Sequence, residues 1–346
     1  RVAGSSSGDC TSIFQEGLRI PPIKICEKGI IKQDILDMIL LNCRTPRERL
    51  GDLWAQIASN RIGEKRILEL INKYDIFMFK QSMEAFLDYS ERRIREGIRQ
   101  IPDGSYDFID YLDDDGIELD KENLPIKVTI EVQEDSILLD FTGSCNQVKG
   151  GINVVKTALY ATVYYALKAI IDPEIPSNAG YYRAIKVIAP EGTIVNAVPP
   201  AAVGGRTDTC QRIVDVIFGA LAKAVPNKVV AGCNSAVTTV LFSGVDPRNK
   251  NFFVYPESLG GGLGARPYKD GMDGVHVHVT NSSNLPIECL EMEYPIKIER
   301  FELIQDSGGA GKFRGGLGIR RDYKILAPME FASHADRQKN PPWGLY

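Results

Sequence analysis

Residues 126–141 read Ile-Lys-Val-Thr-Ile-Glu-Val-Gln-Glu-Asp-Ser-Ile-Leu-Leu-Asp-Phe, and this stretch decides the class of the fold. Apolar residues recur at every second position from 126 to 132 and again from 137 to 141, on either side of Glu134-Asp135. A period of two puts alternate side chains on one face of a strand, so two strands joined by a short turn are predicted. We therefore expect a β-hairpin with one face in a core.

The residues before this hairpin follow a helical period. Thr45-Pro46-Arg47-Glu48 is a typical helix start, with Thr45 as the N-cap, Pro46 at the first helical position and Glu48 placed to close a capping box. Apolar residues then recur at helical spacing as far as Tyr74. We predict helices at about 31–42, 45–74 and 77–100, and the short connection between the last two favours an αα-hairpin.

Helices and strands alternate after the hairpin. We predict helices at 154–171 and 207–224, a strand at 182–189, and strands separated by glycine-rich turns from residue 229 onward. The fold class is therefore α+β: an N-terminal helical hairpin region, 1–105, packed on a mixed or antiparallel β-sheet domain with helices, 106–346. Because the chain starts without Met and ends without completing an element, we expect a fragment of a longer chain that lacks N- and C-terminal parts.

Composition excludes several classes of protein. The 346 residues are 44% hydrophobic and 25% charged, with a net charge of −4, so neither disorder nor a nucleic-acid-binding surface is indicated. Lys156 and Lys168 interrupt the most apolar stretch, which is therefore predicted to be a buried helix and not a membrane span. Seven scattered cysteines without a C-x-x-C pair argue against a disulfide framework and against a structural zinc site. They favour a reducing, cytoplasmic compartment.

Two histidines two residues apart, His276 and His278, are the first candidates for chemistry. On a strand they would share a face, as two ligands of a metal, but a pair is too few to fix an ion. The alternative is a pair of structural histidines that bond to the backbone or to Glu288 and Glu291. We expect no metal bound by this chain alone. His334, in Ser-His-Ala-Asp-Arg, is expected to be a surface or structural residue.

The second candidate is the helix start at Gly204-Gly205-Arg206, which continues through Gln211-Arg212. Paired glycines allow close backbone approach, and free N–H groups at a helix start favour an anion. Arg206 and Arg212 add charge suited to a carboxylate or carbonyl oxygen. The alternative is a glycine turn followed by an ordinary capped helix.

Other polar clusters are interpreted as structural. Gly308–Lys312 resembles a phosphate loop but has Phe313 where Ser or Thr is needed, and Pro267 follows the glycines at 260–264, so neither loop is predicted to bind a nucleotide. The acidic run 113–115 is interpreted as a solvated loop. Cys10 and Cys210 are expected to be buried thiols, because no neighbouring base is evident.

Six segments, taken in order, resemble one family, hydantoinase B/oxoprolinase, over nearly the whole chain. They are Ile-Phe-Gln-Glu-Gly-Leu-Arg-Ile-Pro-Pro (13–22), Arg-Thr-Pro-Arg-Glu-Arg-Leu-Gly-Asp-Leu (44–53), Asp-Phe-Thr-Gly-Ser (140–144), Gly-Val-His-Val-His-Val-Thr-Asn (274–281), Glu-Tyr-Pro-Ile (293–296) and Asp-Ser-Gly-Gly-Ala-Gly-Lys-Phe-Arg-Gly-Gly (306–316). The resemblance implies a B-type subunit of an ATP-dependent amidohydrolase that opens a hydantoin, 5-oxoproline or a related cyclic amide. Alternatives are a subunit of an ATP-dependent ketone carboxylase, and a non-catalytic scaffold for an ATPase.

The resemblance also implies partners and site residues. An actin-like A-type subunit would bind ATP and form a hetero-oligomer with this chain, and a divalent metal, Zn or Mn, would be held by residues that precede the 13–22 motif in the intact protein. His276 and His278 would line the active cavity, and with Asp208 they are our catalytic candidates. The substrate-binding candidates are Gly204, Gly205, Arg206, Gln211 and Arg212.

Overall fold

A computed structural model of the chain describes residues 9–118, 120 and 122–345, so the first eight residues and Tyr346 lie outside it. The chain divides into two compact units. One is formed by residues 17–89, and the other by residue 90 onward together with the segment before residue 17. Within the described residues, none of the helices has the length and apolar character that crossing a membrane requires.

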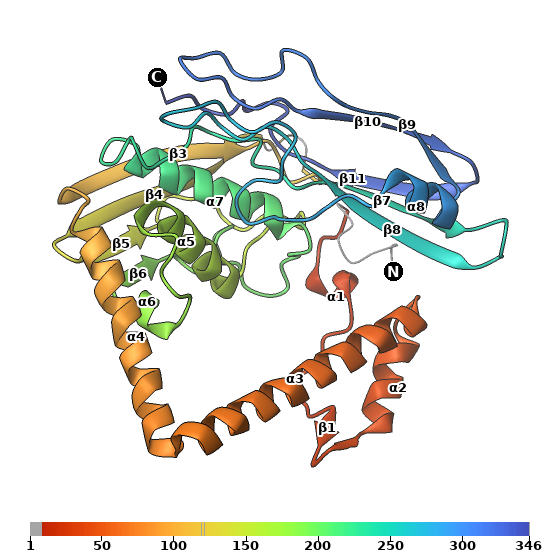
Figure 1. Cartoon of the computed structure of the whole chain (residues 1–346). Coiled ribbons are helices and arrows are strands. Elements are labelled where there is room, and N and C mark those ends of the chain that lie inside the picture. The colour runs from red at the N-terminus through yellow and green to blue at the C-terminus, as the bar shows by residue number, and fades with distance from the viewer. Residues whose placement is uncertain (1–8, 119, 121, 346) are drawn as a thin grey trace. The chain divides into compact units, whose positions relative to one another are not determined.

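The 17–89 unit is mainly helical (Figure 1). It holds a small hairpin, β1 (Cys26–Glu27) and β2 (Ile30–Ile31), followed by α2 (Gln33–Leu41), α3 (Pro46–Tyr74) and the first half of α4 (Ile76–Ile98). Thr45 is the N-cap of α3 with Pro46 in the first turn, as predicted, although the Thr45 side chain makes no capping hydrogen bond. The predicted ends of these helices agree with the structure to within two residues.

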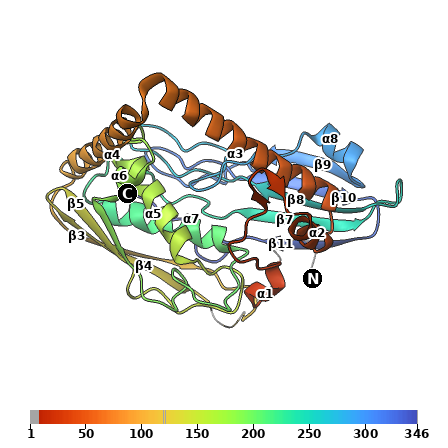
Figure 2. The same ribbon diagram turned by 90° about the horizontal axis from the view of Figure 1, so that it is seen from below.

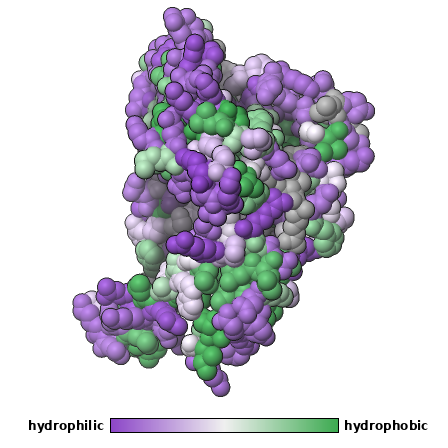
Figure 3. Space-filling view, turned by 90° about the vertical axis from the view of Figure 1, so that its right-hand side faces the viewer, coloured by the Kyte–Doolittle hydropathy of each residue, from purple (hydrophilic) through white to green (hydrophobic). Residues whose placement is uncertain are grey.

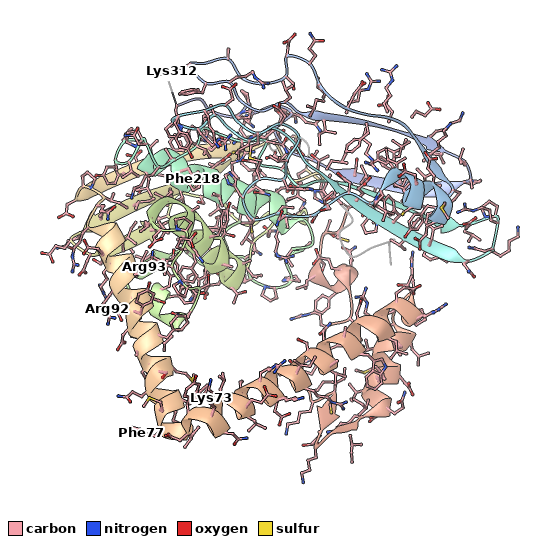
Figure 4. All side chains as sticks on the ribbon, in the orientation of Figure 1. Lys73, Phe77, Arg92, Arg93, Phe218 and Lys312 are labelled. Carbon is pink, nitrogen blue, oxygen red and sulfur yellow. The ribbon has the colours of Figure 1, made fainter. Side chains whose placement is uncertain are left out.

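Helices α3 and α4 do not bury their apolar faces against each other, so the expected αα-hairpin is wrong. No residue of α3 is buried, and Phe77, Met83 and Phe86 of α4 are 74%, 52% and 52% exposed. Figure 4 shows Lys73 and Phe77 near the junction of the two helices. Figure 3, in the lower part of the view, shows apolar side chains on the surface of the 17–89 unit. A short connection alone therefore did not bring the helices together.

The larger unit contains a four-stranded sheet in the order β3-β4-β5-β6, with the bounds β3 (Gly104–Leu112), β4 (Leu124–Gln133), β5 (Ser136–Asp140) and β6 (Ile185–Ile188). Strands β4 and β5 form the predicted antiparallel hairpin, and Ile126, Val128 and Ile130 are fully buried. Strand β6 pairs parallel with β5 after a crossover through α5 (Lys156–Ile171) and α6 (Ala179–Tyr182), which makes the sheet mixed.

Helix α7 (Arg206–Leu221) packs against β3, β4 and α5, so α5 and α7 lie over the sheet (Figures 1 and 2). Every residue of α7 from Asp208 to Leu221 is buried. Ile213, Val216 and Ile217 join Val163 and Leu167 of α5 in the main hydrophobic core. The charged residues of α7 from Asp208 onward are therefore enclosed by the protein, whereas Arg206 at the helix start is exposed.

A second group of strands follows α7. Strands β7 (Thr238–Val245) and β8 (Phe252–Leu259) pair with β11 (Met329–His334) in the order β11-β7-β8, and β9 (Ile296–Leu303) pairs with β10 (Ile319–Ile325). Helix α8 (Ile287–Glu293), which we did not predict, precedes β9. The α+β class is confirmed.

The glycine-rich loops of this region are places where two backbone segments meet, as the structural interpretation predicts. A Cβ at Gly264 would lie 1.9 Å from the carbonyl oxygen of Ala231, and a Cβ at Gly262 would lie 2.1 Å from that of Gly316. A Cβ at Gly308 would lie 2.2 Å from the carbonyl oxygen of Gly315. Only glycine allows such approaches.

Candidate functional site

Three charged side chains lie at intervals of four and three residues along α7: Asp208, Arg212 and Asp215. Residues at this spacing share one side of a helix. They are 3%, 0% and 0% exposed. Each is paired with a residue at the end of β11 or in the segment that follows it, and we call these three pairs the α7 charge ladder. The pairs are Asp208–His334, Arg212–Asp336 and Asp215–Arg337.

The first pair joins the start of α7 to the end of β11. His334 Nδ1 lies 2.7 Å from Asp208 Oδ2, and the other oxygen of Asp208 accepts a 2.5 Å hydrogen bond from the amide of Val237. Burial acts to lower the pKa of His334, but the hydrogen bond and charge of Asp208 outweigh it and raise that pKa. His334 is therefore a structural residue, as expected, and Asp208 has both oxygens engaged.

The second pair centres on the guanidinium of Arg212. It binds the carboxylate of Asp336, lies 3.3 Å from Asp110 of β3, and donates a 2.5 Å hydrogen bond to the carbonyl of Tyr111. Burial raises the pKa of Asp336 to about 6 and outweighs the opposing charge of Arg212. Because Arg212 is fully enclosed by the protein's own groups, the structure favours a structural role over the direct substrate contact that we expected.

The third pair is the most crowded. Asp215 Oδ2 accepts hydrogen bonds from Ser235 and from Arg337, the latter at 2.6 Å, and Oδ1 lies 2.9 Å from His278 Nε2. Burial acts to raise the pKa of Asp215, but its partners, above all His278, hold it below the ordinary value. Burial likewise opposes the charge on His278, yet Cys233 and Asp215 raise its pKa to about 10.

Cys233 lies beside this third pair, and sequence reasoning missed it because 45 residues separate it from His278. One ligand atom from each of Asp215, Cys233 and His278 lies within 4.8 Å of the other two. Aromatic rings flank the imidazole: Phe218 of α7, labelled in Figure 4, has its ring centre 5.4 Å from that of His278, and Tyr165 of α5 lies at 6.4 Å. Asp215, Cys233 and His278 could hold a metal ion.

The two histidines do not share the face of a strand. Residues 276–278 lie outside the strands, and His278 adopts a left-handed φ of 47°. His278 is turned into the protein toward Asp215, whereas Nε2 of His276 is buried and has no hydrogen-bond partner among the described residues. Burial lowers the pKa of His276. Unlike His278, His276 is therefore not paired with a carboxylate through Nε2 within the described part of the chain.

The helix start at Gly204 holds a carboxylate of the chain itself. The amides of Val203 and Gly204 donate hydrogen bonds of 2.7 and 2.6 Å to Oε1 of Glu16, which ends α1 (Ile13–Glu16), and Gly205 donates to the carbonyl of Gly151. These amides are thus engaged, which the sequence analysis did not foresee. Arg206 remains exposed at the start of α7.

Gln211 ties the histidine segment to α7. Its amide nitrogen donates a 2.9 Å hydrogen bond to the hydroxyl of Thr280, and its oxygen accepts one of 3.4 Å from the amide of Val279. Gln211 is 1% exposed, so it positions residues 279–280 from inside the protein. This fixes the loop that carries His276 relative to α7.

The acidic run 113–115 is not the solvated loop that we expected. Asp113 and Asp115 are 6% and 4% exposed. Asp113 accepts hydrogen bonds from the amides of Gln338, Lys339 and Asn340, and these bonds outweigh burial and lower its pKa. The prediction of a solvated loop was wrong because the hydrogen-bond partners of Asp113 lie more than 220 residues away in the sequence. Asp113 thus anchors the segment after β11, which contributes Asp336 and Arg337 to the α7 charge ladder.

Comparisons with known proteins agree with this arrangement of elements. A family model described as hydantoinase B/oxoprolinase matches residues 1–346. An uncharacterized protein of Methanocaldococcus jannaschii is 44% identical over 99% of this chain and 59% of its own length. The B-type subunit of a putative D-/L-hydantoinase of Pseudomonas sp. is 35% identical over 99% of this chain and 60% of its own length. The chain thus spans about three fifths of these two relatives.

Two solved structures share the fold. The crystal structure of an ATP-dependent caprolactamase from Pseudomonas jessenii matches with a TM-score of 0.85 at 31% identity, over 93% of this chain and 56% of that one. A nucleotide-free acetone carboxylase matches with a TM-score of 0.87 at 17% identity, over 99% of this chain and 48% of that one. At this lower identity the likeness concerns the fold alone.

Proposed function

We propose, from the premise that this chain belongs to the hydantoinase B/oxoprolinase family, that it is part of a B-type subunit of an ATP-dependent amidohydrolase that opens a cyclic amide. One observation carries the proposal: the similar hydantoinase and the ATP-dependent caprolactamase are both named for rings closed by an amide bond. The ATP would be bound by a separate A-type subunit, since neither glycine loop of this chain fits a phosphate-binding pattern.

The residues of the site suit hydrolysis in which the protein positions one imidazole. Opening an amide ring needs a group that takes a proton from the attacking nucleophile and returns one to the leaving nitrogen. His276, with an unbonded Nε2, is the candidate for this group. The α7 charge ladder and Gln211 hold its surroundings rigid, and the exposed Arg206 is the cation available to a polar or phosphorylated substrate oxygen.

The test is reconstitution of the full-length subunit with its A-type partner, followed by an assay of ATP-dependent turnover of hydantoin, 5-oxoproline and caprolactam. We expect one of these to be opened, and His276→Gln to lower kcat by about 100-fold or more with an unchanged melting temperature. His334→Gln is the control for kcat, assayed where circular dichroism shows the variant to be folded, and we expect its kcat to stay near the wild-type value because the imidazole of His334 is already paired with Asp208.

Gly205→Ala provides a second probe of the helix start. A Cβ at Gly205 would meet the carbonyl oxygen of Gly151 at 3.5 Å, an ordinary contact, so the fold should accept the change. If the substrate approaches the backbone here, turnover falls while stability is kept.

The substrate assay also separates the alternatives. Turnover of a ketone with bicarbonate, and of no cyclic amide, would show that the protein is part of a ketone carboxylase. If the partner hydrolyses ATP at a rate that none of these compounds changes, the chain would be a non-catalytic scaffold for the ATPase.

A further inference from the structure

The group formed by Asp215, Cys233 and His278 has the geometry of a metal site that is separate from His276 and Arg206. The three side chains come from α7, from the loop before β7 and from the loop after β8. Their ligand atoms lie within 4.8 Å of one another. The side chains of Asp215 and His278 are 1% and 2% exposed, and Cys233 is 1% exposed. A site this enclosed has no bulk water to compete for the ligands.

The donor atoms are held in place by neighbouring groups. Ser235 and Arg337 both bind Oδ2 of Asp215, which leaves Oδ1 directed at His278 Nε2. The amide of Gly264 donates a 3.3 Å hydrogen bond to the sulfur of Cys233. Hydrogen bonds from neighbouring groups to the ligand side chains orient these side chains and raise the affinity of a metal site.

Arg337 lies beside the group and bridges Asp215 and Asp110. It binds Oδ2 of Asp215, which is the oxygen that does not face His278, so the position of Oδ1 is fixed from the opposite side.

We propose that Asp215, Cys233 and His278 form a binding site for a divalent metal of the zinc type. One sulfur, one imidazole nitrogen and one carboxylate oxygen suit Zn²⁺ or Co²⁺ and disfavour Mg²⁺ and Ca²⁺, which prefer oxygen ligands alone. Three protein ligands leave a fourth position for water or another ligand, as in catalytic zinc sites. This reverses our expectation that the chain binds no metal alone, because two of the three ligands are not evident in the sequence.

The proposal does not depend on the proposed function, and its test does not use activity. The 346-residue chain is stripped with a chelator, titrated with Co²⁺ and followed by absorbance, since a thiolate ligand gives a sulfur-to-cobalt charge-transfer band. We expect the band to saturate at about one Co²⁺ per chain, to be displaced by Zn²⁺, and to be unaffected by Mg²⁺. Elemental analysis of the unstripped protein measures zinc directly.

Matched variants decide which residues bind. Cys233→Ser should abolish the charge-transfer band, whereas Cys210→Ser, a buried cysteine of α7 outside the group, should leave it unchanged. Ser235→Ala, which keeps all three ligands, should weaken Co²⁺ binding by about 10- to 100-fold. Circular dichroism establishes that each variant folds. No band in the folded wild-type chain, or the same band in Cys233→Ser, would overturn the proposal.

Discussion

Arg212 shows how burial changes the meaning of a charged residue. A guanidinium near a glycine pair is a good candidate for anion recognition when only the sequence is known. In the structure the guanidinium of Arg212 is bound by Asp110, Asp336 and the carbonyl of Tyr111. A buried ion pair is strongly destabilised when one partner is removed, since the other charge stays behind without compensation. Arg212 therefore belongs to the interior of the fold.

We predict that Arg212→Met lowers the free energy of unfolding by about 3–5 kcal/mol, because it leaves the buried Asp336 without its cation and leaves Asp110 with Arg337 alone. Urea denaturation of the purified chain measures this. Arg206→Met is the control, since Arg206 is exposed and its loss should change stability by less than about 0.5 kcal/mol. Equal stabilities of the two variants would show that Arg212 is not part of the interior network.

The pair His334–Asp208 should make stability depend on pH. The pKa of His334 is raised in the folded protein, so its contribution is complete below the unfolded value of about 6.5 and is lost as pH rises through the folded value. We predict that His334→Gln, which cannot carry a positive charge, is less stable than wild type near pH 6 and that the difference shrinks toward about pH 9. Denaturant titrations across this range test it. A difference independent of pH would contradict the assignment.

At the scale of elements, α7 and the segment that begins at the end of β11 are joined by side-chain pairs although more than a hundred residues separate them in the sequence. The contacts run in the same order along both, from Asp208–His334 through Arg212–Asp336 to Asp215–Arg337. Periodicity predicted α7 and its apolar face well, because that signal is local. It gave no sign of the partners, because side-chain pairing at long range leaves no pattern within a single segment.

The same limit applies to the candidate site. The sequence named His278 and Asp208 as catalytic candidates, and in the structure His278 faces Asp215 of α7 whereas Asp208 is paired with His334. The prediction that Cys10 and Cys210 are buried thiols is confirmed. It missed Cys233 and Asp215, which look like ordinary residues of a loop and a helix. Predicting a strand at 276–278 failed because alternating apolar residues also occur in the irregular loop that turns His278 inward.

The glycine loops supply a prediction for the elements that they join. Gly264→Ala would place a Cβ 1.9 Å from the carbonyl oxygen of Ala231, whose peptide plane is held by the 2.9 Å hydrogen bond from the amide of Gly232 to the carbonyl of Trp343. We expect a loss of about 1–3 kcal/mol in unfolding free energy, measured by denaturation. Gly309→Ala is the control, because nothing lies within 4 Å of its Cβ. If both variants are equally stable, the close approach at Gly264 is not needed for folding.

At the scale of the whole molecule, the two compact units differ in how much they bury. The larger unit holds both hydrophobic clusters, whereas the 17–89 unit keeps side chains such as Leu41, Phe77 and Met78 exposed at 86%, 74% and 47%. Helix α4 crosses from one unit to the other: its first half is mainly exposed, and Ser90, Ile94 and Ile98 in its second half are fully buried. Burial, more than helix propensity, stabilises helices in proteins.

We therefore predict a sharp change in amide hydrogen exchange along a single helix. In the isolated chain, amides of α3 and of α4 before Ser90 should exchange on the order of 100-fold or more faster than those of α7, because local opening there exposes little new apolar surface. Amides after Ser90 in α4 should approach the protection of α7, which makes the two halves of α4 each other's control. Exchange measured by mass spectrometry on overlapping peptides resolves the change. Uniform protection across α4, at the level of α7, would mean that residues 17–89 share the stability of the main core and that their apolar side chains are covered in solution.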